Sequence, residues 1–166
     1  MDALELAIRM EKDAIDFYKD AVKRTRHPFG KRMFEGFIED EKRHLKALDD
    51  IFSGLGLRMD PQSPMKNVRS IFEELRDEMM QRIEADSDEI DAIKVALDIE
   101  KKGYDLYRKM VEESTDEKIK ELFDLLSKEE EEHFNILQNT LSFLEDTGNW
   151  FMWEEHSIID GGTPWA

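Results

Sequence analysis

The sequence predicts an all-α protein: a four-helix bundle in which two antiparallel helix hairpins are joined by a long crossover containing a short helix. Two observations predict this fold. Apolar residues recur at spacings of three and four in four long segments, which is the period of a helix buried along one stripe. The breaks between these segments are short, long and short, as hairpin, crossover and hairpin require.

The periodic segments give the expected helices, which lie at about 3–26, 31–52, 88–113 and 116–145. Residues 27–30 read His-Pro-Phe-Gly and are expected to form a tight turn between the first two helices. Ser114 or Thr115 is available as the N-cap of the last helix.

The connection between the two hairpins covers residues 53–86, begins with glycines and prolines, and carries an amphipathic pattern at 68–83. A segment of this length can run along a bundle of about 30 Å and start the second hairpin from the opposite end. We assign residues 1–146 to one bundle domain and 147–166 to a C-terminal tail that carries all three tryptophans. Because exposed aromatic clusters favour association, we expect the tail to pack on the bundle or on a partner subunit, with a functional lid as the alternative.

Composition excludes several functional classes. There is no cysteine, so disulfides, zinc–thiolate sites and iron–sulfur clusters are excluded. The net charge of −16 argues against a nucleic-acid partner, whose phosphates would be repelled. No apolar run approaches the ~20 residues that span a bilayer, and no signal peptide begins the chain, so we expect a cytoplasmic protein without a membrane partner.

An internal repeat with an offset of 89 residues is the most informative feature. A lone glutamate followed by a Glu-x-x-His motif occurs twice at identical spacing, as Glu11, Glu41 and His44 and as Glu100, Glu130 and His133. The flanking residues match as well: Tyr18 is equivalent to Tyr107, and Phe34 to Phe123.

All six repeated residues interrupt the apolar stripes of their helices. A buried carboxylate costs several kcal/mol even after relaxation, so four of them need compensation. No Lys or Arg lies on these stripes at matching depth, whereas two divalent cations would balance four carboxylates and leave both histidines neutral. The alternative is a solvated acidic face, which is common in so acidic a chain, but it does not explain the placement within apolar stripes.

The ligand set also indicates how two ions would be shared. Residues i and i+3 lie on one helix face, so the Glu and His of each motif can approach the same metal. We expect Glu41 and Glu130 to bridge, Glu11 and Glu100 to bind terminally, and each metal to receive one histidine, which leaves open positions for small molecules. Oxygen-rich ligation with one imidazole favours two iron ions; manganese and zinc are compatible as well.

Four further residues are candidates for supporting roles. Asp40 and Glu129 directly precede the two motifs and are expected to accept the second N–H of a histidine across the bundle. Tyr18 and Tyr107 lie two turns beyond the lone glutamates. They are either hydrogen-bond donors or one-electron relays at the site, or core aromatics with satisfied hydroxyls.

The two remaining histidines, His27 and His156, are expected at the surface.

With this ligand set in this helix order, residues 1–146 resemble the ferritin-like di-iron carboxylate superfamily and, within it, the rubrerythrin family. The resemblance implies a ferritin-like bundle with a di-iron site, a homodimer or larger homo-oligomer, and often reduction of hydrogen peroxide. Two features depart from the family pattern. Rubrerythrins carry a rubredoxin domain with four cysteines, and they tend to carry an extra glutamate three residues beyond the third-helix ligand. Here there is no cysteine, and that position is Gly103.

The leading functional hypothesis is therefore a di-iron oxidoreductase that reduces hydrogen peroxide or dioxygen with a separate electron donor. An iron-binding or iron-sequestering protein with slow ferroxidase chemistry is the first alternative. The second alternative is a metal-stabilised structural or partner-binding bundle.

Overall fold

The computed structural model describes residues 3–54 and 87–145, and these form helices without any strand. The helices are α1 (Ala3–Arg24), α2 (Pro28–Phe52), α4 (Ser87–Glu113) and α5 (Glu117–Glu145). They confirm the predicted all-α bundle. The predicted crossover with its short helix, the C-terminal tail and His156 lie outside the described residues.

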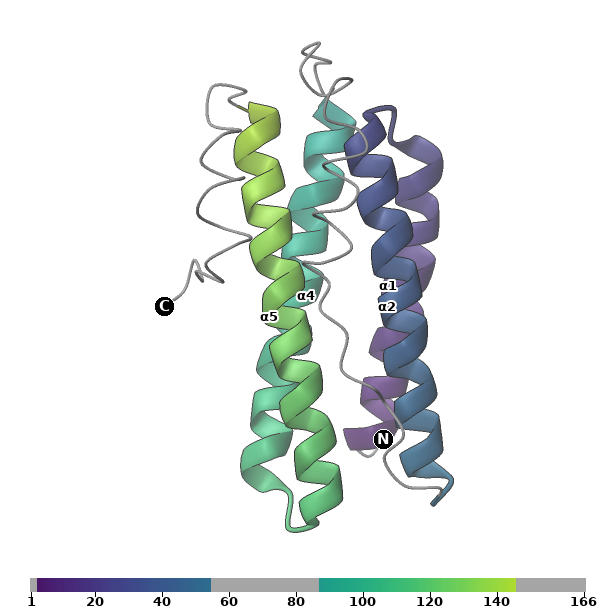
Figure 1. Cartoon of the computed structure of the whole chain (residues 1–166), viewed down its shortest axis with the longest axis vertical. Helices are drawn as coiled ribbons and strands as arrows, with labels where there is room; N and C mark the ends of the chain where they lie inside the picture. The colour runs from purple at the N-terminus through teal and green to yellow at the C-terminus, as the bar shows by residue number, and fades with distance from the viewer. Residues whose placement is uncertain (1–2, 55–86, 146–166) are drawn as a thin grey trace.

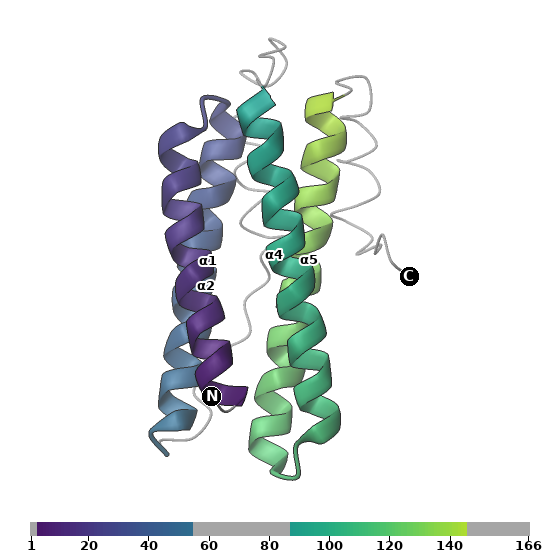
Figure 2. The same cartoon turned by 180° about the vertical axis from the view of Figure 1, so that it is seen from behind.

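The helices run along the long axis of the molecule as two hairpins, α1 with α2 and α4 with α5 (Figures 1 and 2). The hairpins meet through α1 against α4 and α2 against α5. In Figure 1, α2 ends at the bottom of the bundle and α4 begins at the top, so the second hairpin starts from the opposite end, as predicted. No helix within the described ranges is both long enough and apolar enough to cross a bilayer.

Two helix starts differ from the prediction. Helix α2 begins at Pro28, because proline at the first helical position loses no backbone hydrogen bond, so the expected turn over 27–30 lies mostly inside the helix. Helix α5 is capped by Asp116: its Oδ1 accepts hydrogen bonds from the backbone N–H groups of Lys118 (2.9 Å) and Ile119 (3.2 Å). The predicted caps Ser114 and Thr115 are therefore wrong, since the aspartate stands directly before the first helical residue.

The expected surface position of His27 is also wrong. Only 1% of this residue is exposed. The carboxylate of Glu89 at the start of α4 accepts hydrogen bonds from the backbone N–H groups of Arg26 and His27, the latter at 2.9 Å. These bonds hold the turn against α4. The rings of His27 and Phe143 lie edge to face, with their centroids 6.1 Å apart. Neither ring nitrogen makes a hydrogen bond to any described residue.

We expect His27→Phe to reduce the loss of stability in acid. Burial lowers the pKa of His27 below its ordinary 6.5, against the opposing charge of Glu89. Below pH 6.5 the unfolded chain therefore binds more protons than the folded one. The stability contributed by the neutral ring is present above pH 6.5 and is lost as the pH falls through the lowered pKa. Urea unfolding of parent and variant at about pH 7.5 and 5.5 measures this; equal pH dependence of the two proteins would contradict it.

The core is divided into two apolar clusters that lie toward opposite ends of the bundle. One contains Tyr18 and Phe34, and the other contains Tyr107 and Phe123. The repeat is visible in their geometry. The rings of Tyr18 and Phe34 are stacked with centroids 5.7 Å apart, and those of Tyr107 and Phe123 are stacked at 5.8 Å. The predicted ligand residues belong to neither cluster.

Candidate metal centre

The structure brings all the predicted ligands together inside the bundle. Each helix supplies one or two of them, and each residue is at most 4% exposed: Glu11 from α1, Glu41 and His44 from α2, Glu100 from α4, and Glu130 and His133 from α5. The amphipathic phase of each helix places these polar residues on its inward face.

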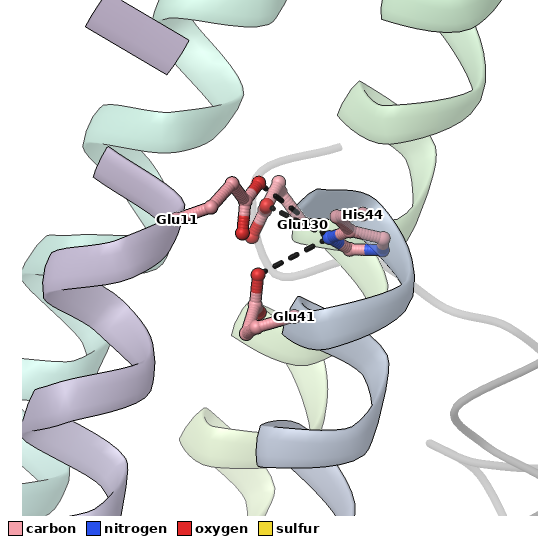
Figure 3. Close-up of side chains that lie close together, drawn as sticks. All are labelled: Glu11, Glu41, His44 and Glu130. Carbon is pink, nitrogen blue, oxygen red and sulfur yellow. Dashed lines mark hydrogen bonds and ion pairs between the residues drawn. The ribbon is translucent and has the colours of Figure 1, made fainter. Parts of the chain in front are cut away.

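Their side chains form two overlapping groups, in each of which the potential ligand atoms lie within 4.8 Å of one another. Figure 3 shows the first group, with His44, Glu11, Glu41 and Glu130 converging from three helices. The Nδ1 atom of His44 lies 3.1 Å from Glu41 Oε2, 3.5 Å from Glu130 Oε1 and 3.6 Å from Glu11 Oε1.

The second group repeats this arrangement around His133. Its Nδ1 atom lies 3.0 Å from Glu41 Oε1, 3.4 Å from Glu100 Oε2 and 4.0 Å from Glu130 Oε2. Glu41 and Glu130 thus belong to both groups, whereas each lone glutamate and each histidine belongs to one. The two imidazoles lie 6.0 Å apart between ring centroids.

The outer nitrogen of each histidine contacts a carboxylate from the opposite hairpin. His44 Nε2 lies 3.0 Å from Glu129 Oε1, and His133 Nε2 lies 3.0 Å from Asp40 Oδ2. This confirms the acceptors expected from the sequence. A carboxylate at Nε2 favours the tautomer that carries its proton there, which leaves Nδ1 of the neutral ring free to bind a metal.

Arg43 is a supporting residue that the sequence did not reveal. Its guanidinium donates hydrogen bonds to both oxygens of Glu129, one at 3.1 Å, and its Nη2 lies 3.6 Å from Asp40 Oδ1. One cation therefore contacts both carboxylates that orient the histidines. The equivalent position in the second repeat is Glu132, so comparison of the repeats gave no signal for an arginine here.

The two tyrosines cross-link the repeats. The hydroxyl of Tyr18 donates a hydrogen bond to Glu100, and that of Tyr107 donates one to Glu11. Burial and the charge of the adjacent glutamate, Glu100 for Tyr18 and Glu11 for Tyr107, raise the pKa of each tyrosine well above 10, so both hydroxyls keep their protons at neutral pH.

The four inward carboxylates differ sharply in protonation. Burial and the charge of Glu11 raise the pKa of Glu41 to about 8. Burial and the charge of Glu100 raise the pKa of Glu130 well above its usual range. Burial opposes ionisation of Glu11 as well, but a hydrogen bond with Glu41 and the charge of His44 lower its pKa to about 2. The charge of His133 likewise outweighs burial and lowers the pKa of Glu100.

Without a bound metal, both histidines favour the charged form. Burial disfavours the imidazolium of His44, but the carboxylates of Glu41 and Glu11 outweigh it and raise the pKa well above 6.5. His133 behaves in the same way, with Glu100 as its main partner. Protons therefore supply the positive charge that two divalent ions would otherwise bring.

Unsatisfied buried atoms show that the residues present fit a metal. Among the described residues, four potential ligand atoms are buried and make no hydrogen bond of good geometry, although His133 Nδ1 lies 3.0 Å from Glu41 Oε1: Glu11 Oε2, Glu41 Oε1, Glu100 Oε2 and His133 Nδ1. Each such atom costs about 1–3 kcal/mol. One cation in each ligand group would provide partners for all four atoms, and a donor set rich in carboxylate oxygen with imidazole suits iron or manganese.

Comparison with known proteins agrees with this geometry. The family model described as Rubrerythrin matches residues 2–141, which include every residue of both ligand groups. No curated protein and no solved structure matches the chain. Since the family model covers most of the sequence, the chain belongs to the rubrerythrin family.

Proposed function

We propose that the protein is a di-iron carboxylate oxidoreductase that reduces hydrogen peroxide or dioxygen with electrons from a separate donor. The observation that carries the proposal is the sharing of Glu41 and Glu130 by the two ligand groups. Two carboxylates common to both groups suit two ions held close together. By ligand type, manganese would suit the same residues as well as iron, and zinc is compatible with them.

In this proposal Glu41 and Glu130 would be the ligands shared by both ions. Glu11 and His44 would complete one site, and Glu100 and His133 would complete the other. The Nδ1 atom of each histidine faces the carboxylates, and the outer carboxylates Asp40 and Glu129 hold the rings in that orientation. This assignment uses every inward carboxylate and both imidazoles.

When bound, two ferrous ions would supply the two electrons that, with two protons, convert one hydrogen peroxide to two waters. The chain's own residues prepare the site for this chemistry. Burial of all the ligand residues keeps bulk water away. Tyr18 and Tyr107 fix the terminal glutamates through hydrogen bonds from hydroxyls that remain protonated. They are the proposed hydrogen-bond donors or electron relays of the site.

The electron donor is proposed to be a separate protein or a small cytoplasmic reductant, because the chain has no cysteine to hold an iron–sulfur or rubredoxin-type centre. We further propose that the protein acts as a homodimer or larger homo-oligomer. Neither a nucleic acid nor a membrane is part of the proposal.

Stopped-flow mixing of the ferrous-loaded protein with peroxide tests the function. We expect rapid oxidation of about two irons per chain in the parent and in Glu39→Ala, an exposed neighbour on α2 that pairs with Lys42. Glu41→Ala removes a ligand shared by both groups and should lose the rapid phase. If the parent is oxidised no faster than Glu41→Ala, the proposed function fails.

Iron sequestration with slow ferroxidase chemistry is the second candidate, since it would use the same two ligand groups. The size of the assembly separates the two. A closed shell of many subunits supports sequestration, whereas a dimer supports the oxidoreductase. A bundle stabilised by metal for structural reasons predicts instead that metal raises the melting temperature while peroxide and dioxygen leave the ions unchanged.

A further inference from the structure

A second, larger pocket lies at the end of the bundle where α1 begins and α4 turns into α5, which is the lower end in Figure 1. Its volume is about 340 Å³, within the range of small-molecule sites in proteins. Three helices and the α4–α5 loop line it with mostly apolar side chains and two polar ones. The lining includes Leu4, Met110, Glu113, Ser114, Ile119 and Phe123.

This pocket is separate from the candidate metal centre. None of its lining residues belongs to either ligand group. Phe123 is only 1% exposed and forms the inner wall, where its ring stacks on that of Tyr107 with the centroids 5.8 Å apart. A molecule in the pocket would therefore contact the apolar core and none of the proposed metal ligands.

The polar edge of the pocket carries negative charge and hydrogen-bond acceptors. Glu113 is the last residue of α4, where the backbone carbonyls at the end of a helix carry a partial negative charge. The hydroxyl of Ser114 donates its proton to the carbonyl oxygen of Asp116 at 3.2 Å, which leaves its lone pairs available. The last turn of α4, all of which the structure describes, has no basic side chain. A cation with N–H donors would complement this edge.

Lys109 neutralises Glu113 only weakly. Its Nζ atom lies 4.0 Å from Glu113 Oε1, one helical turn away, and the two side chains are 67% and 66% exposed. Water and salt screen an exposed pair at this distance, so it contributes little. The net charge of −16 adds a long-range attraction for cations.

The internal repeat is broken at this pocket. The positions 89 residues before Glu113, Ser114 and Ile119 are Arg24, Thr25 and Gly30. At that end of the bundle Thr25 is buried, and a Cβ atom built on Gly30 would lie 3.1 Å from Thr25 Cγ2, so a larger side chain has no room. The charge is also reversed, from arginine to glutamate. The open space and the negative edge therefore occur together at the α4–α5 end.

We propose that this pocket binds a small organic cation: a primary amine whose ammonium group contacts Glu113 and the carbonyl end of α4, and whose apolar or aromatic body packs against Phe123. The volume is that of about eleven water molecules in the liquid, so a body of roughly ten heavy atoms fits. The apolar lining supplies affinity for the body, and the acceptors at the edge select the charged end.

Calorimetric titration of the full chain with three probes of similar size tests the inference. The probes are 2-phenylethylammonium, its neutral counterpart 2-phenylethanol, and the anion 3-phenylpropionate. We expect the ammonium compound to bind about tenfold more tightly than the alcohol, and the anion to bind most weakly, because hydrogen bonds between charged partners are the stronger ones.

Two glutamine variants separate the role of the pocket edge from general attraction to an acidic protein. Glu113→Gln should reduce the preference for the ammonium compound over the alcohol to about twofold or less, and should leave the affinity for the alcohol unchanged. Glu112→Gln removes an exposed carboxylate beside it that is not part of the lining, and should keep the parent's preference.

Nuclear magnetic resonance of the methionine methyl groups locates the bound molecule. The signal of Met110, assigned with Met110→Leu, should shift when 2-phenylethylammonium is added, whereas that of Met33 in the other apolar cluster should not. Ile119→Trp would fill the pocket and should abolish both the shift and the binding of all three probes.

Equal affinity of the parent for the ammonium compound and the alcohol would overturn the inference, as would a preference that persists in Glu113→Gln. Tightest binding of 3-phenylpropionate would also overturn it, since the pocket would then select an anion at the N-terminus of α1. Absence of binding by any probe at about 10 mM would do the same. None of these outcomes bears on the proposed function, because the pocket and its test need no bound metal.

Discussion

Loading the metal-free protein with two divalent ions is expected to release about four protons at neutral pH. The groups concerned are those whose protonated forms are favoured without metal: Glu41, Glu130, His44 and His133. Each must lose its proton to act as a ligand. Glu11 and Glu100 contribute none, because their pKa values are lowered and they are already ionised.

The apparent metal affinity should therefore rise steeply with pH. Ions and protons compete for the same atoms, so raising the pH through the value of about 8 for Glu41 removes a competing proton. The stabilisation of the fold by metal should rise in parallel, since binding to the folded state alone adds RT ln(1 + [L]/Kd) to the stability.

Calorimetric titration with manganese(II) in two buffers of different ionisation enthalpy measures the number of protons released. Glu39→Gln changes an exposed carboxylate on the same helix and should release as many protons as the parent. Release of one proton or none, or an affinity independent of pH between about 6 and 8, would show that the inward carboxylates and histidines are not the ligands.

The repeat and the helical period predicted most of this site. Because the two copies share an offset, one helical phase assigned Glu11 and Glu100 to equivalent inward positions, and the four-helix topology brought them together. The contacts of Asp40 and Glu129 with the histidines followed from the same phase. Periodicity carries this information because it fixes which face of each helix is buried.

The errors arose at residues whose positions are set neither by the repeat nor by the helical period. His27 is buried because Glu89, distant in sequence, binds the backbone of its turn, and no local pattern encodes that contact. Asp116 is the N-cap of α5 because this helix begins at Glu117, and the periodicity of apolar residues does not define a helix end to the exact residue. Arg43 was missed because it breaks the repeat that revealed its neighbours.

That break in the repeat gives the second large expected effect: Arg43→Gln should weaken binding of both metal ions by about 10–100-fold. The guanidinium contacts Glu129, which orients His44, and lies 3.6 Å from Asp40, which orients His133. With Glu132 at the equivalent position, the second repeat has no arginine of its own. One substitution should therefore disturb both histidines.

The physical route is protonation of the outer carboxylates. Burial opposes ionisation of Glu129, but contacts with His44 and then Arg43 outweigh it and lower the pKa. Asp40 depends in the same way on His133, His44 and Arg43. Without the arginine both pKa values rise. A protonated carboxyl would donate to Nε2 rather than accept from it, and the proton of the neutral ring would move to Nδ1, the nitrogen that faces the metal site.

Manganese titrations of the parent, Arg43→Gln, Arg43→Lys and Arg108→Gln distinguish this role from a merely structural one. Arg43→Lys keeps the charge without the paired hydrogen bonds and should recover part of the affinity. Arg108 forms a half-exposed ion pair with Asp124 far from the histidines, so Arg108→Gln should leave the manganese affinity within about twofold of the parent's.

The affinity lost in Arg43→Gln should be partly regained at higher pH, where the outer carboxyls ionise again. If Arg43→Gln weakens the binding of one ion only, Arg43 does not act through both carboxylates. The same holds if the lost affinity is not regained at higher pH, because ionisation of both carboxyls should return both histidines to the metal-binding tautomer.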